Sequence, residues 1–182
     1  MSNKITSTEM FANELKNFIS DRALRDKELK SIAKAIDYKL SVFKPTNRLK
    51  LSIELVYLNT FLGSIILRQS FSQSEFTSET VDEIIEIFVN NLLLQWIHKS
   101  YEPVEYYKSN RLNKWERLLK DLDSSDQIMN DFKILTDSFY TDLTNKQINP
   151  IFISMLTIRF NRYLFIYADY ILQMIDNFEL EE

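Results

Sequence analysis

Residues 51–67 read LSIELVYLNTFLGSIIL, and this stretch decides the fold. Its large apolar residues recur at spacings of three and four, which predicts an α-helix with one broad hydrophobic face. These residues are Leu51, Leu55, Leu58, Phe61, Leu62, Ile65 and Ile66, while the small Ser52, Val56, Thr60 and Gly63 share another arc where a second helix can approach closely. Because a helix covered on several sides is buried, we expect a helix over 47–70 at the centre of the fold.

The composition of the whole chain favours helices as well. The 182 residues include one Gly and three Pro, whereas average usage predicts roughly a dozen Gly and nine Pro. Hairpin turns and phosphate-binding loops need glycine, so sheets and nucleotide-binding loops are both disfavoured. The sequence therefore predicts an all-α protein.

Helical periodicity recurs on both sides of the central stretch. Capping signals are expected at Thr6 with Glu9, at Asp21, at Thr46, at Thr80 with Glu83 or at Ser78, at Ser124 with Gln127, and at Asn149 with Pro150. With them we expect further helices over about 7–19, 22–43 and 150–178, and three more whose apolar stripes cover residues 81–96, 104–122 and 128–139. A polar connection rich in Ser and Thr covers about 70–80. The prediction is a single compact bundle of about seven helices spanning 1–182.

Several function classes lack their residues here. The chain has no Cys and a single His, His98, so the usual zinc and di-iron sites cannot form within one chain. His98 is interpreted either as a residue at a helix C-terminus or as a general base, and no nucleophile or phosphate-binding motif accompanies it. We expect no metal, no cofactor and no enzymatic activity.

Two apolar stretches, 51–67 and 151–175, raise the question of a membrane span. The first contains Glu54 and the second contains Arg162 and Asp169, and charges at a bilayer centre are energetically expensive. The first twenty residues contain no apolar run of signal-peptide length. We therefore expect core helices, no membrane span and a cytoplasmic location.

Glu54 interrupts the apolar face of the central helix. An unpaired carboxylate there is costly, so it must be paired, protonated, next to a cavity or locally exposed. The leading hypothesis is a buried carboxylate held by a Tyr or Arg from another helix. The alternative is a small-molecule pocket or catalytic site with Glu54 in it.

Charge is unevenly divided along the chain. Residues 1–50 contain eleven Lys and Arg against six Asp and Glu, whereas residues 51–182 contain eleven against twenty. An N-terminal basic surface can bind nucleic-acid phosphates or an acidic protein, but interleaved carboxylates such as Asp26 are also typical of an ordinary solvated helix. The candidate basic surface consists of Arg22, Arg25, Lys27, Lys30, Lys34 and Lys39.

The predicted C-terminal helix carries two apolar lines. One is broad enough to pack on the bundle; the other is a narrow repeat of seven, Ile151, Ile158, Phe165 and Leu172, set among charged residues. Such a repeat is typical of a seam between two helices. Either another helix of this chain covers it, or it binds a protein partner or a second copy.

These observations lead to a functional expectation. The leading hypothesis is a non-enzymatic protein-interaction module, such as an adaptor, inhibitor, immunity or regulatory protein. A nucleic-acid-associated regulator using the basic N-terminal region and a small-molecule-binding domain around Glu54 are the alternatives.

Overall fold

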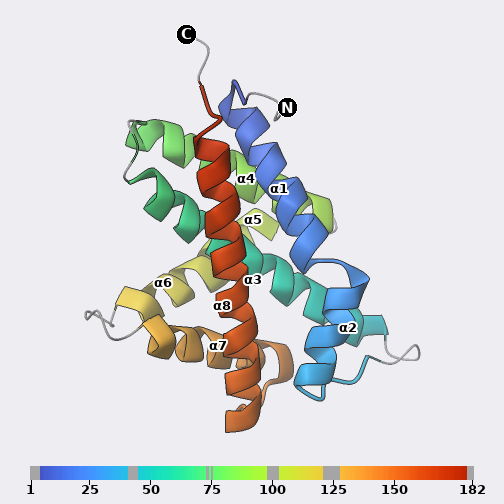
Figure 1. The fold of residues 1–182 in the computed structure, drawn as a ribbon. Coiled ribbons are helices and arrows are strands. Elements are labelled where there is room, and N and C mark those ends of the chain that lie inside the picture. The colour runs from blue at the N-terminus through green and yellow to red at the C-terminus, as the bar shows by residue number, and fades with distance from the viewer. Residues whose placement is uncertain are drawn as a thin grey trace.

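The computed structural model describes residues 5–40, 45–72, 74, 76–97, 103–120 and 128–179. The helices are α1 (Thr8–Ala23), α2 (Asp26–Ala35), α3 (Pro45–Phe71), α4 (Ser78–Trp96), α5 (Pro103–Tyr106), the π-helical turn η1 (Tyr107–Leu112), α6 (Asn113–Lys120), α7 (Ile128–Thr144) and α8 (Pro150–Ile175). Because α5, η1 and α6 follow one another without a break, the described residues form seven helices (Figure 1). The predicted all-α bundle is confirmed.

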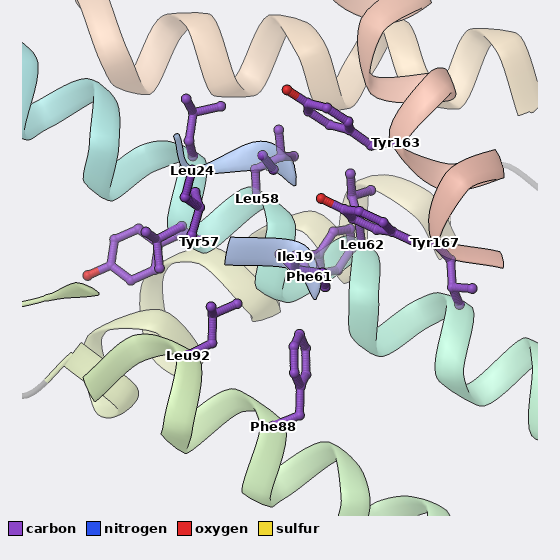
Figure 2. Close-up of a cluster of buried hydrophobic side chains, with 14 of the residues drawn as sticks. Ile19, Leu24, Tyr57, Leu58, Phe61, Leu62, Phe88, Leu92, Tyr163 and Tyr167 are labelled. Atoms are coloured by element: carbon purple, nitrogen blue, oxygen red, sulfur yellow. The ribbon is translucent and has the colours of Figure 1, made fainter. Parts of the chain in front are cut away.

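Helix α3 lies at the centre of the bundle. It contacts α1, α4, α7 and α8, and Figure 2 shows Ile19 of α1, Phe88 of α4 and Tyr167 of α8 among the side chains gathered around it. A Cβ atom added at Gly63 would lie 2.8 Å from Phe88 Cζ and 3.1 Å from Ile19 Cδ1. The arc of small residues was predicted to let a second helix approach α3 closely, and the contacts at Gly63 confirm this prediction.

The single helix expected over 22–43 is wrong. Helix α1 continues through Asp21 to Ala23, Arg25 is extended with φ −68° and ψ 150°, and α2 ends before Asp37, whose φ of 50° is left-handed. The break lets Leu24 be buried at the turn while α2 packs its own apolar face on the bundle. In one straight helix, Leu24 and the apolar side chains of α2 could not both be buried against the core.

Most helix starts lie within a few residues of the expected ones, but the capping residues differ. Ser7, not Thr6, accepts a hydrogen bond from the Met10 backbone nitrogen, and Thr77 caps α4. Helix α3 starts at Pro45, before Thr46, whereas the expected start of α8 at Asn149 and Pro150 is confirmed. The capping pair expected at Ser124 with Gln127 and the residue His98 lie outside the described residues.

Helix α8 runs across the front of the bundle in the view of Figure 1 and packs on α3 and α7. Its end is tied to the start of the described chain by backbone hydrogen bonds from Ile5 N to Asn177 O (3.1 Å) and from Glu179 N to Ile5 O (3.0 Å). Of the described helices, α3 alone is long and apolar enough to cross a bilayer, and 72% of that apolar window is buried inside the protein.

Candidate functional site

One line of large apolar side chains on α8 is open to solvent. Phe165 is 76% exposed and Ile158 69% exposed, whereas Phe160 and Tyr167 on the same helix are fully buried. We call this line the α8 strip; it consists of Ile151, Met155, Ile158, Phe165 and Leu172. No other part of the described chain covers it, so the expectation that another helix of this chain fills the seam is wrong for these residues.

The α8 strip arises because the helix is apolar on two opposite sides. At about 100° per residue, the strip lies opposite a face whose side chains pack into the core. That face consists of Leu156, Thr157, Phe160, Tyr163, Tyr167, Ile171 and Met174, all buried. Its two buried tyrosines are bonded, Tyr167 to the Asn59 side chain and Tyr163 to Glu28 at 2.6 Å. Burial and the Glu28 carboxylate raise the pKa of Tyr163 well above its usual range, so its hydroxyl stays a donor.

Charged residues accompany the strip in a definite order along α8. Arg159 is already engaged, since it donates to Glu28 at 2.8 Å and to Ser31 at 2.9 Å. Arg162 and Asp169 are exposed within the strip, and among the described residues neither has an ion-pair partner. A hollow of about 410 Å³ lies between this part of α8 and α2, and Met155, Ile158 and Arg162 are among the residues that line it. Asp169 accepts a hydrogen bond from Gln173 Nε2 at 3.0 Å, and Asp176 at the end of α8 is likewise exposed without an ion-pair partner among the described residues. The strip thus offers apolar contacts together with charges of both signs that form no ion pair within the described chain.

Glu54 is buried and paired, as its leading hypothesis predicted. Arg111 donates to both carboxylate oxygens, at 2.6 Å and 3.1 Å, and Asp142 lies 3.6 Å from the Arg111 guanidinium. Lys114 in turn binds Asp142 at 2.8 Å. Burial raises the pKa of the Glu54 carboxyl, while the hydrogen bonds from Arg111 lower it, and burial is the larger effect. The pair joins α3 to η1 and holds two charges in the core.

The sequence interpretation did not single out Arg111, the partner of Glu54. The buried residues of this region, Pro103, Tyr107, Arg111 and Trp115, are spaced by four. A regular α-helix would rotate such a series steadily off the core, whereas the wider π-helical turn keeps it facing inward. That spacing of four was the available signal.

A cavity of about 320 Å³ lies between α3, α4 and η1. Its wall includes Phe61, Ile85 and Tyr107, with Lys108 and Glu116 among the charged residues that complete it. Tyr107 carries the one described buried side-chain polar atom without a hydrogen-bond partner, its hydroxyl oxygen. Glu54 does not line this cavity, so the structure does not place the carboxylate where the pocket hypothesis needed it.

The six basic candidates are all exposed but do not share one helix. Arg22 lies on α1, Arg25 in the turn and Lys39 beyond α2, because the expected continuous helix is broken. Arg25 pairs with Asp21 at 3.1 Å and Lys30 pairs with Asp26 at 2.7 Å. The remaining candidates, Lys27 and Lys34, lie on α2. This mixture of paired and separated charges is typical of a solvated surface.

Within the described ranges, no three His, Cys, Asp or Glu side chains gather in a way that could hold a metal ion. The structure thus defines a helical bundle with one unpartnered apolar helix face. Comparison with protein-family models, with curated proteins and with solved structures gave no match.

Proposed function

We propose that this chain is a non-enzymatic protein-interaction module, acting as an adaptor, inhibitor, immunity or regulatory protein, that binds a helical protein surface along the α8 strip. The observation that carries this proposal is the exposure of Ile158 and Phe165 on a helix whose other side is fully packed. Large apolar side chains collected in one exposed line are typical of protein interaction sites.

The chemistry of the strip indicates the kind of surface that it fits. Apolar residues at a spacing of seven pack against a facing helix, where each side chain enters a space between residues of the partner. Arg162 and Asp169 lie within the strip, so a partner needs a carboxylate and a cation at matching positions. A helix with an apolar line and both charges meets these requirements.

The test compares two variants that each replace one exposed apolar residue by a charge. Phe165→Asp changes the strip, while the matched control Leu94→Asp changes a residue on α4 that is 54% exposed. Each tagged variant and the unchanged protein are cross-linked both as purified protein and in lysate of the source cells. We expect Phe165→Asp to lose cross-linked complexes that Leu94→Asp retains, with unchanged helical circular dichroism.

Complexes that all three proteins form equally would contradict the proposal, because they would not depend on the strip. The purified protein could instead bind nucleic acid. If that binding is lost at high salt and in the double variant Lys30→Glu plus Lys34→Glu, the result would favour the nucleic-acid-associated regulator.

A further inference from the structure

We propose that the occupant of the α8 strip is a second copy of this chain, packed antiparallel so that α8 meets α8 about a twofold axis near residues 165 and 166. This inference rests on the proposed interaction through α8 and identifies its partner. A twofold interface uses the same surface on both copies, so the surface must be complementary to itself.

The order of charges along α8 provides this self-complementarity. Arg159 and Arg162 lie in the first half of the helix and Asp169 and Asp176 in the second half or at its end. In a parallel pair, equivalent residues meet, so arginine would face arginine and aspartate would face aspartate. In an antiparallel pair, the basic half of each helix meets the acidic half of the other, which is favourable.

The spacing of the two charges within the strip fixes the register. Arg162 and Asp169 are seven residues apart, which is two turns, so both point to the same side of α8. An axis midway between them places Arg162 of each copy opposite Asp169 of the other. The same register sets Phe165 beside its equivalent and brings Ile158 within one residue, about 1.5 Å along the helix, of the position opposite Leu172 of the second copy. Apolar contacts and charges are therefore matched by one arrangement.

The extent of this contact indicates its strength. The overlap runs from about residue 155 to residue 176, about 33 Å of helix, along a face about 10 Å wide. These dimensions correspond to about 330 Å² on each copy, which is smaller than the interface of a stable complex and fits a weak, transient pair. We therefore expect a reversible dimer with a Kd in roughly the micromolar range.

Charge exchange tests both the partner and the register. R162D places two carboxylates opposite each other in the proposed pair, and D169R places two guanidinium groups opposite each other. Each single variant should weaken the dimer by about tenfold or more, measured by sedimentation equilibrium from about 1 to 100 µM. The double variant R162D/D169R restores both pairs, as does an equimolar mixture of the two single variants, so both should dimerise as the unchanged protein does.

The other outcomes separate the two proposals. Single variants that dimerise as tightly as the unchanged protein would overturn the antiparallel register, because a parallel pair opposes like charges before and after the exchange. The unchanged protein could stay monomeric at 100 µM while Phe165→Asp still abolishes capture of another protein. That result would contradict a second copy as the partner, but it would still support the interaction module. Absence of any association that depends on the strip would overturn both.

Discussion

Glu54 on α3 and Phe165 on α8 both interrupt the hydrophobic pattern of their helix, but only Glu54 is buried against a partner within the chain. Glu54 is a charge on an apolar face, and Arg111 binds it within the same chain at 2.6 Å. Phe165 is a large aromatic residue among charges, and it remains 76% exposed. Glu54, which has its partner inside the chain, contributes to the fold, whereas the exposure of Phe165 is the observation on which the proposed contact with another molecule rests.

The largest effect is expected from two phenylalanines on the same helix. Phe160 is fully buried and Phe165 is largely exposed. Phe160→Ala should lower the free energy of unfolding by about 3–5 kcal/mol, because it leaves a cavity in the core. Phe165→Ala should change it by less than about 0.5 kcal/mol when urea unfolding is followed in dilute solution, where the chain is monomeric. Equal losses for the two variants would show that the strip belongs to the core.

The Glu54 pair gives the next largest effect. Glu54→Leu removes the bidentate partner of the Arg111 guanidinium and leaves it in the core with Asp142, 3.6 Å away, as the remaining carboxylate near it, so it should destabilise the protein by about 3 kcal/mol. Combining it with Arg111→Met removes both charges and should recover most of that loss, because a buried ion pair contributes little beyond an apolar pair of similar size. The comparison uses the urea midpoint of each variant. A double variant whose loss equals the sum of two large single losses would contradict this account.

Close packing at Gly63 should have a smaller effect. Gly63→Ala places a methyl group against the buried Phe88 ring, and overpacking of this kind costs about 1–3 kcal/mol. Alanine also favours the helix by about 1 kcal/mol relative to glycine, so we expect a net loss of about 1 kcal/mol. Phe88→Leu in the same background should reduce the penalty of the added methyl group, as measured by thermal unfolding. A stabilised Gly63→Ala protein would show that the helices are free to separate there.

The sequence predicted those parts of the molecule that depend on local pattern. The central position of α3, the start of α8 at Asn149 and Pro150, and the pairing of Glu54 follow from periodicity, capping chemistry and the energy of a buried charge. The break at Arg25 could not be predicted in the same way. It carries neither Gly nor Pro, and the turn is favoured because Leu24 and the apolar face of α2 are buried against the rest of the bundle.

The candidate site was predicted in a similar, partial way. The repeat of seven in Ile151, Ile158, Phe165 and Leu172 identified a seam, but not whether the chain itself would cover it, since that depends on where the other helices lie. Arg111 was missed although, at about 100° per residue, it lies between Tyr107 and Trp115 on the apolar face expected for its helix, as Glu54 does on α3. The sequence did not show that this arginine and Glu54 would meet, because their pairing depends on how α3 and η1 pack together.

Sedimentation equilibrium of the unchanged protein over about 1 to 100 µM tests the central claim most directly. The account predicts an average mass that rises with concentration from the 21.7 kDa of one chain toward twice that value, and that stays near 21.7 kDa for Phe165→Asp. A mass of 21.7 kDa at every concentration would contradict self-association through α8, and a dimer that Phe165→Asp leaves intact would contradict the strip as its interface.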